Sequence, residues 1–439
     1  MNVADSQRLG SALEHLGYEF TGRLEDADVI VLNTCVVRQS AEDKAYGRLS
    51  SLRPLKKMNP ALVVNLMGCL VGIREPEKLR NRFPFVDVFS PPSDPGTLIS
   101  FLTQGEVKRE EALETAERFA VMDEDLSIHP TELKQTLEGL LLPENERGRT
   151  VSVHVPVVLG CSHACSFCII PSRRGGERSR PADEIEAEAV SLAAQGVKEI
   201  TLLGQIVDRY GKDNPKEGDL AALLRRLSQV EGLERIRFLT SHPNYFSEDL
   251  MESVAELPKV MPHIEIPIQA GDDEILQHMR RGYTEADYRR KVADIRERIP
   301  GCSIATDIIV GFPGESEEQF MKTYHLLEEL RMDVAHLARY STRPGTVAER
   351  LYQDDVAEEE KMRRFRILED MQEKISGEIT AGTMGKKVDV LFEEKVKGRW
   401  RGRTPTNKLV FVESDEELRG MVRAVKVTWT GPWSMQARV

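Results

Sequence analysis

Apolar and polar positions follow two alternating patterns along most of the chain, and together they predict strands and helices in turn. Between residues 151 and 375, short apolar runs are separated by segments whose apolar residues recur every three or four positions. The runs are typical of buried strands and the segments between them of amphipathic helices. This alternation predicts an α/β fold with a partial (β/α)6 barrel at its centre. The expected strands cover 151–159, 199–203, 236–240, 264–268, 302–310 and 334–340.

The two ends of the chain carry different patterns. Apolar runs at 28–33 and 62–67 flank a helical pattern at 41–55, which predicts an open α/β domain. Residues 376–439 instead show strand patterns and turn residues, which predicts a small all-β barrel of OB-like type. The expected domains are 1–100, a helical linker at 101–150, a barrel domain at 151–375 and an all-β domain at 376–439.

Composition narrows the class of protein. The 439 residues carry a formal net charge of −12, which argues against non-specific coating of nucleic acid. Residues 385–439, however, contain twelve Lys and Arg but only seven Asp and Glu. This excess of positive charge suggests a nucleic-acid-facing tail or simply a solvated surface. The sequence shows no secretory signal and no apolar run long enough for a membrane span, so we expect a cytoplasmic protein.

Polar residues follow several of the predicted barrel strands. Gln205, Ser241 and Gln269 come directly after strands, and Asp307 lies near the end of another. Right-handed crossovers place the carboxyl ends of parallel strands on one rim. We therefore expect cofactor and substrate to meet at this rim.

The stretch from Gly160 to Cys168 brings three thiols to the end of the first barrel strand. Cys161, Cys165 and Cys168 are spaced C-x3-C-x2-C. Thiolates are soft ligands that favour iron–sulfur clusters or zinc. Three ligands leave one position of a cluster open, whereas zinc with His163 as a fourth ligand remains the alternative.

This stretch, with Ile169-Ile170-Pro171, Arg174-Gly175 and Arg178-Ser179-Arg180-Pro181 after it, resembles the methylthiotransferase family of radical S-adenosylmethionine (SAM) enzymes. The resemblance implies a [4Fe–4S] cluster held by the three cysteines, with SAM bound to its free iron. It also implies cofactor contacts from Gln205, where this superfamily contacts the SAM amino group, and from the turn that begins at Gly311.

Two further cysteines match the same family. Asn33-Thr34-Cys35 and Met67-Gly68-Cys69 resemble two of the three motifs that hold a second [4Fe–4S] cluster. Without the resemblance, two buried structural cysteines would be the favoured interpretation. The third motif begins upstream of Met1, so we expect an internal start site or a fragment; loss of the ligand is the alternative.

The tail resembles the RNA-binding TRAM module of this family. The resemblance rests on Gly402-Arg403-Thr404 with Asn407, and it implies RNA contacts from Arg401, Arg403, Thr404 and Asn407. A solvated edge with core aromatics is the alternative interpretation. Loops that combine arginine with aromatic residues are typical of RNA recognition.

Residues 201–207 with Tyr210-Gly211 resemble the bacterial branch of the family that modifies tRNA. The implied reaction adds a methylthio group to carbon 2 of N6-isopentenyladenosine beside the anticodon. A 5′-deoxyadenosyl radical attacks that carbon, the N-terminal cluster supplies sulfur, and a second SAM supplies the methyl group. The implied partners are a tRNA anticodon stem-loop and an electron donor such as flavodoxin or ferredoxin.

We expect a monomer that does not associate with membranes. Two other functions stay open: methylthiolation of an aspartate of ribosomal protein S12, and a non-catalytic, metal-containing RNA-binding protein.

Overall fold

The computed structural model describes residues 1–36, 39–73, 77–103 and 142–439 and divides the chain into two compact units. The first consists of Met1–Arg147, Leu159–Ser162 and Ile169–Glu177, and the second of Gly148–Val158, His163–Cys168 and Arg178–Val439. Most of the predicted helical linker, residues 104–141, lies outside the described residues. The proposed division into four domains remains a prediction.

The first unit is a parallel sheet between helices. Its sheet has the order β1-β2-β3, and the residue pairs Val29↔Val63 and Asn65↔Val88 set the register. Helix α2 packs Leu49 and Leu52 into a cluster with residues of β2, and α1 and α4 pack into a second cluster. The elements are α1 (Asn2–His15), η1 (Leu24–Asp26), β1 (Val29–Thr34), α2 (Gln39–Met58), β2 (Val63–Gly68), α3 (Glu77–Arg82), β3 (Val88–Ser90) and α4 (Gly96–Thr103).

The second unit contains the predicted partial barrel. Two parallel three-stranded sheets, β4-β7-β8 and β9-β10-β11, supply its wall in the described residues, and an isolated bridge from Ile236 to Val260 extends β8 toward the second sheet. The strands are β4 (Ser152–Pro156), β7 (Glu199–Leu203), β8 (Arg235–Leu239), β9 (His263–Glu265), β10 (Ser303–Val310) and β11 (Val334–Arg339).

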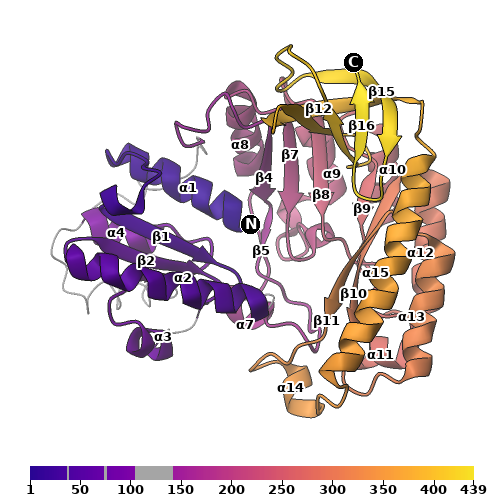
Figure 1. Cartoon of the computed structure of the whole chain (residues 1–439), viewed down its shortest axis with the longest axis horizontal. Coiled ribbons are helices and arrows are strands. Elements are labelled where there is room, and N and C mark those ends of the chain that lie inside the picture. Colours follow the sequence, from indigo (N-terminus) through magenta and orange to yellow (C-terminus); the bar gives the residue numbers. More distant parts are fainter. Residues whose placement is uncertain (37–38, 74–76, 104–141) are drawn as a thin grey trace. The chain divides into compact units, whose positions relative to one another are not determined.

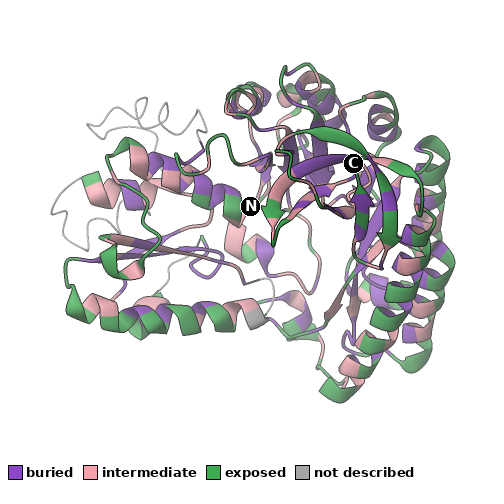
Figure 2. Ribbon diagram, turned by 45° about the horizontal axis from the view of Figure 1, so that its top comes forward, coloured by how far each residue is buried: buried purple, intermediate pink, exposed green. Residues whose placement is uncertain are grey.

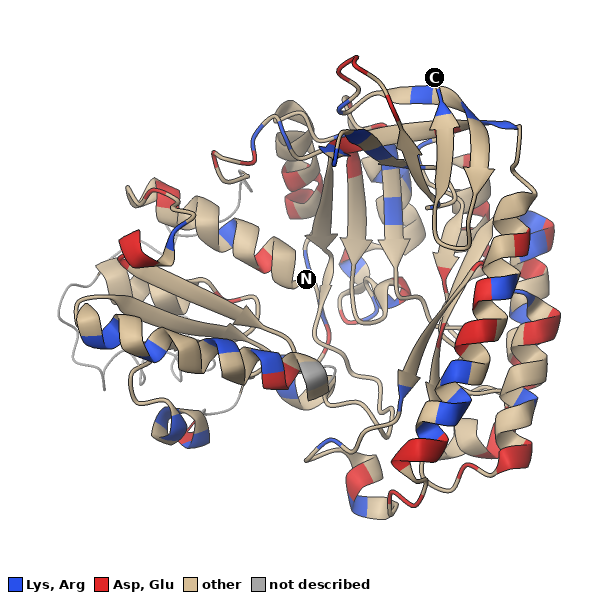
Figure 3. Ribbon diagram, viewed as in Figure 1, with Lys and Arg blue, Asp and Glu red and all other residues tan. Residues whose placement is uncertain are grey.

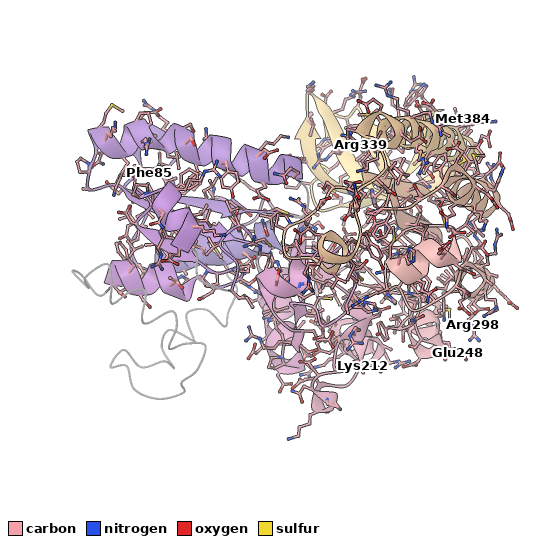
Figure 4. The ribbon with its side chains drawn as sticks, turned by 90° about the horizontal axis from the view of Figure 1, so that it is seen from below. Phe85, Lys212, Glu248, Arg298, Arg339 and Met384 are labelled. Carbon is pink, nitrogen blue, oxygen red and sulfur yellow. The ribbon has the colours of Figure 1, made fainter. Side chains whose placement is uncertain are left out.

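Helices cover the outside of this barrel, and Figure 2 shows buried strands behind helices whose outward faces are exposed. Arg298 of α12 forms an exposed ion pair with Glu248 of α10, and Figure 4 labels both residues. The helices of the second unit are α8 (Ala182–Ala194), η2 (Val207–Arg209), η3 (Pro215–Glu217), α9 (Leu220–Leu227), α10 (Glu248–Glu256), α11 (Asp273–His278), α12 (Glu285–Arg298), α13 (Glu317–Leu330), α14 (Val347–Leu351) and α15 (Glu358–Ala381), whereas α7 (Ile170–Arg174) belongs to the first unit.

Prolines shorten two of the predicted strands. The run at 151–159 is interrupted after Pro156, and the chain then forms β5 (Val158–Leu159), which pairs with β6 (Arg178–Ser179). The run at 264–268 is a strand only as far as Glu265, because Pro267 has no N–H to donate to a neighbouring strand.

The C-terminal residues form the predicted all-β barrel, which is closed in the order β12-β13-β14-β16-β15. Its core contains Phe392, Trp400 and Val425. A Cβ at Gly402 would lie 2.4 Å from the Leu391 carbonyl oxygen, so the strand crossing requires glycine there. The strands are β12 (Lys387–Val396), β13 (Arg399–Arg403), β14 (Leu409–Val412), β15 (Val422–Thr430) and β16 (Met435–Arg438).

The small barrel lies at the end of the large one where the strands begin (Figure 1). Arg237 of β8 donates hydrogen bonds to the Thr404 and Pro405 carbonyl oxygens, at 2.7 and 2.8 Å. Its Nε lies 2.9 Å from Oε2 of Glu199, and both side chains are at most 4% exposed. A buried ion pair therefore holds the arginine that fixes the small barrel.

None of the helices in the described ranges is both long and apolar enough to cross a membrane.

Replacing Glu199 with Gln should destabilise the second unit strongly, because the substitution leaves the buried Arg237 cation without a counter-charge. Breaking such a pair costs about 3–5 kcal/mol. All three tryptophans lie in the C-terminal barrel, so their fluorescence during urea unfolding reports on it directly. The control is Asp249→Asn, which breaks an exposed pair with Arg225 and should cost at most about 1 kcal/mol. Equal effects of the two substitutions would contradict this account.

Candidate active site

The loop with the three predicted cluster cysteines begins at a position that requires glycine. Gly160 has a φ of 70°, and a Cβ there would lie 2.1 Å from the Gly176 carbonyl oxygen. The next residue, Cys161, donates its backbone N–H to the Gly175 carbonyl oxygen at 3.0 Å. The local structure therefore explains why glycine precedes Cys161. Only glycine lets the backbone approach the Gly176 carbonyl oxygen this closely.

The middle of the loop is fixed to the second unit through Ser166, which is fully buried. Its backbone N–H donates to the Met279 carbonyl oxygen at 3.1 Å, and its hydroxyl donates to that of His278 at 2.7 Å. Its own carbonyl oxygen accepts a hydrogen bond from Ala348. Ser166 thus holds the segment that carries Cys165 and Cys168.

A buried arginine faces one of the thiols. Arg281 is 5% exposed, and its Nη1 lies 3.1 Å from Sγ of Cys165. Its other donors bond to the Tyr283 hydroxyl and to the Pro267 carbonyl oxygen. In the described residues no carboxylate lies within ion-pair distance of Arg281. A buried cation needs a negative partner, and here the candidate is the sulfur of Cys165.

Donor chemistry supports a cluster at this loop. All six cysteines are free thiols. Across the described parts of the chain, no three His, Cys, Asp or Glu side chains are grouped closely enough to hold a metal ion. The fit therefore rests on three thiols in one short loop and on a buried cation beside Cys165, which suits a negatively charged thiolate cluster. His163, the ligand of the zinc alternative, has Nδ1 3.3 Å from the same sulfur.

The structure brings the predicted rim residues to neighbouring strand ends. Ser241, after β8, donates its backbone N–H to the Glu265 carbonyl oxygen at the end of β9. Gln269 donates in the same way to Asp307 of β10, at 2.9 Å, and has a φ of 83°. Gln205 follows β7 on the same side of the sheet. Cofactor contacts from these four side chains remain a proposal.

Gly311 lies in a turn that packs against α15. Its backbone N–H donates to Oε2 of Glu315 at 2.7 Å, and Glu315 is paired with Arg364 of α15. A Cβ at Gly311 would lie 2.3 Å from Cγ of Lys361. The turn is therefore packed tightly against α15, and the amide of Gly311 is already bonded.

Three buried polar groups beside the rim lack hydrogen-bond partners in the described structure. They are Oδ1 of Asp208, the hydroxyl of Ser241 and Nε2 of His242. The other oxygen of Asp208 accepts the His242 backbone N–H at 2.9 Å. Unsatisfied buried polar atoms are uncommon and costly, so their concentration here is typical of a binding site.

Burial changes the ionisation of these groups. It raises the pKa of Asp208 to about 7 and lowers that of His242 to about 2, which keeps the imidazole neutral. Burial, together with the nearby charge of Asp307, raises the pKa of Glu265 to about 7. The rim thus holds carboxyl groups that are partly protonated near neutral pH.

Cys35 and Cys69 lie at neighbouring strand ends of the first unit. Strands β1 and β2 are paired up to Thr34↔Gly68, and Cys69 donates its backbone N–H to the Thr34 carbonyl oxygen. A Cβ at Gly68 would lie 2.5 Å from that same oxygen, so the residue before Cys69 must be glycine.

This pair of thiols also has a buried arginine. Nε of Arg174 lies 3.1 Å from Sγ of Cys69, and its Nη2 lies 3.8 Å from the carboxylate of Asp5. Burial raises the pKa values of both Cys69 and Asp5, and Arg174 opposes both shifts. Burial lowers the pKa of the Met1 amino group, and Asp5, Cys69 and Cys35 oppose that shift.

Several of these residues could not be identified from sequence motifs. Asp208 and Arg281 belong to none of the motifs that resemble the family. His242 precedes a proline, a position that suits a turn residue as well as a functional one. Arg174 lies within the stretch that resembles the family, but nothing in the sequence indicates that it lies beside Cys69. The available signal was the position of Asp208 and His242 just after predicted strands.

The predicted RNA-binding residues of the tail lie in two settings. Thr404 is 4% exposed, and Nδ2 of Asn407 lies 3.3 Å from Nε2 of His263, at the start of β9. Arg401 pairs with Glu394 at 2.5 Å, and Arg403 lies 3.5 Å from Glu393. Their contact with RNA remains a prediction, and in this structure they bond to the protein itself.

Two protein families match parts of the chain. Residues 155–327 match the radical SAM superfamily, and residues 1–90 match the uncharacterised protein family UPF0004. The chain is 46% identical to tRNA-2-methylthio-N(6)-dimethylallyladenosine synthase of Roseiflexus sp. (strain RS-1), over 99% of this chain and 87% of that protein. It is 42% identical to the protein of that name in Dehalococcoides mccartyi (strain CBDB1), over 100% and 96% of the two chains.

Solved structures support the fold. The radical SAM methyltransferase TsrM of Kitasatospora setae, with cobalamin and a [4Fe–4S] cluster bound, superposes with a TM-score of 0.56. The match covers 79% of this chain and 73% of that one at 16% identity. The cobalamin-dependent radical SAM enzyme OxsB gives a TM-score of 0.52 over 84% and 53% of the two chains, at 14% identity.

Replacing Asp208 with Asn should change how stability depends on pH. A carboxyl group whose pKa is raised on folding binds its proton more tightly in the folded state. The free energy of unfolding therefore decreases as pH rises from about 4 to about 7. The variant lacks this loss, which amounts to at most about 4 kcal/mol. Urea unfolding at several pH values measures it, with Asp294→Asn on the exposed face of α12 as control. Parallel pH profiles for wild type and Asp208→Asn would show that the shift is absent.

Proposed function

Since this chain belongs to the family of tRNA-2-methylthio-N(6)-dimethylallyladenosine synthases, we propose that it adds a methylthio group to carbon 2 of N6-isopentenyladenosine beside the tRNA anticodon. The observation that carries the proposal is the loop with Cys161, Cys165 and Cys168. It follows a barrel strand, lies within a radical SAM match and has a buried arginine at one sulfur.

We assign the cysteines to two clusters. Cys161, Cys165 and Cys168 would hold the cluster whose open iron binds SAM. Cys35 and Cys69 would supply two ligands of a second cluster. Donor chemistry supports both assignments, because Arg281 and Arg174 each place a buried positive charge against a thiol of one group. Bound SAM and the clusters supply the radical, sulfur and methyl chemistry that side chains cannot provide.

The rim residues have binding and orienting roles in this proposal. Gln205, Ser241, Gln269 and Asp307 would bind and orient SAM and the target base, and the packed turn at Gly311 would support them. His242 is neutral and lies at the rim, with a ring nitrogen that lacks a partner. It can therefore offer a hydrogen bond without adding charge. The adenine must leave its stack to reach the rim, which costs least in a single-stranded loop.

The partners follow from the same reaction. The proposed substrate is the anticodon stem-loop of tRNA, and the proposed electron donor is a small redox protein such as flavodoxin or ferredoxin. We further propose that the enzyme acts as a monomer in the cytoplasm, where tRNA is modified. Sedimentation of the reconstituted protein tests the monomer.

A deletion strain carrying a plasmid copy of the gene tests the reaction. Digests of its tRNA should contain the methylthio nucleoside with the wild-type copy and lack it with Cys165→Ala, since one ligand of the SAM-binding cluster is gone. Cys302→Ala is the matched control, because Cys302 precedes β10 outside all cysteine motifs, and it should retain the product.

Three results would count against this function. Unchanged digests in the deletion strain would refute it. Loss of a methylthio group from ribosomal protein S12 instead would assign the chain to the other branch of the family. Zinc without iron in anaerobically purified protein would favour the non-catalytic alternative.

A further inference from the structure

A row of positive charges crosses the outer face of the C-terminal barrel. Lys387 of β12 is paired directly with Lys426 of β15, and Lys426 is paired in turn with Arg438 of β16. All three residues are exposed, while Val425 and Val427 on either side of Lys426 are buried. The alternation of strand residues therefore places the three cations on one outer face. Figure 3 shows Lys and Arg positions on β15 and at the end of β16.

These cations are not neutralised by the protein. Within the described residues, none of the three has a carboxylate within ion-pair distance. Asp389, two residues along β12, is the acid that shares this face with them. Like charges placed directly opposite each other on neighbouring strands destabilise a sheet. A row of three uncompensated cations therefore suits a ligand that brings negative charge.

An exposed tryptophan continues the same face, and a second lies in the adjoining turn. Trp429 is 47% exposed and is paired with Gln436, the next outward residue of β16 before Arg438. Trp433, in the turn between β15 and β16, is 54% exposed. A Cβ at Gly431 would lie 2.5 Å from Cη2 of Trp429, so the turn fits closely around that ring and helps to fix it. Large aromatic surfaces left in water beside cations are typical of nucleic-acid interfaces.

The predicted RNA-binding loop, in contrast, has arginines that pair with acids and a threonine that is buried. Arg401 and Arg403 lie close to Glu393 and Glu394, and Thr404 is buried against the start of the large barrel's strands. Other exposed cations of the small barrel, such as Lys397 and Arg423, lie outside the row of cations, whereas three cations without an ion pair in the described residues lie on the face formed by Lys387, Lys426, Arg438, Trp429 and Trp433. We name this set the outer basic face.

We propose that the outer basic face binds folded RNA, with phosphates along the row of cations and an unpaired base stacked on the tryptophans. This inference rests on the proposed function, because it assigns a second contact to the same tRNA substrate. The contact is separate from the rim, since the small barrel lies at the opposite end of the strands. It increases affinity for the whole tRNA and does not act on the reacting base.

Salt dependence of tRNA binding tests the row of cations. Fluorescence anisotropy with the full-length reconstituted protein gives log K against log salt for wild type and for the double variant Lys387→Ala/Lys426→Ala. Loss of two phosphate contacts should lower the magnitude of the slope by about 1.4 to 1.8. The matched control is Arg366→Ala/Lys374→Ala, which removes two exposed cations of α15 and should leave the slope unchanged.

Stacking predicts a different signature. Trp429→Ala should weaken binding by about 5- to 150-fold with the salt slope unchanged, because a base–aromatic contact displaces no counterions. If Arg401→Ala/Arg403→Ala lowers the slope while Lys387→Ala/Lys426→Ala does not, the proposal is overturned in favour of the loop. If Trp429→Ala instead turns a sedimenting dimer into a monomer without changing RNA affinity, the face is a protein interface and the proposal is also overturned.

A short anticodon stem-loop separates this proposal from the proposed function. Methylthiolation of the stem-loop by wild-type protein depends on the clusters and the rim, whereas affinity for whole tRNA depends on the outer basic face. Absence of product together with the expected salt slopes would refute the enzyme and leave the RNA face supported. Normal product formation with unchanged salt slopes in the Lys387→Ala/Lys426→Ala variant would refute the RNA face alone.

Discussion

The contact between Arg281 and Cys165 is the interaction on which this account of the site depends. A guanidinium group is costly to bury, and the protein offers this one a hydroxyl, a carbonyl oxygen and a sulfur as partners. A thiolate that ligates a metal is negatively charged, whereas a free thiol is neutral. The arrangement therefore makes sense when Cys165 carries negative charge, as it does in a cluster. Arg174 repeats the arrangement at Cys69 in the first unit.

The residues at the two ends of the large barrel differ in what they bind. At the carboxyl ends of the strands, buried polar atoms are left without partners, and carboxyl groups have raised pKa values. At the opposite end, Glu199 and Arg237 are paired, and Lys408 lies 2.5 Å from Asp333. Charged residues at the starts of the strands therefore stabilise the contact with the C-terminal barrel. Polar and ionisable groups at the carboxyl ends of the strands are available to bind ligands. This division matches the general placement of sites in parallel barrels.

Much of the fold could be predicted from the sequence, because apolar periodicity records which residues are buried. The strands at 199–203 and 236–240 appear as β7 and β8 within one residue at each end. Prediction failed where a single backbone group decides the outcome, as at Pro156 and Pro267. The motif with Cys161, Cys165 and Cys168 could be recognised because its three thiols lie close together in sequence, whereas Cys35 and Cys69 were identified only through the family resemblance. Arg281 could not be recognised, since 116 residues separate it from Cys165.

In the tail, too, contacts between residues distant in sequence could not be predicted. The Gly-Arg-Thr motif predicted RNA contacts from one loop, but motif matching cannot tell whether a loop faces solvent or another part of the chain. In the structure, Thr404 and Asn407 lie against Arg237 and His263, whose positions depend on strands more than 140 residues earlier.

Electron paramagnetic resonance of anaerobically reconstituted, reduced protein tests the central claim most directly. The account predicts a [4Fe–4S] signal that changes when SAM is added, because the open iron takes the cofactor as a ligand. With Cys165→Ala the SAM-dependent change should disappear, while the signal of any second cluster remains. A SAM-dependent change that persists without Cys161, Cys165 and Cys168 would contradict the account.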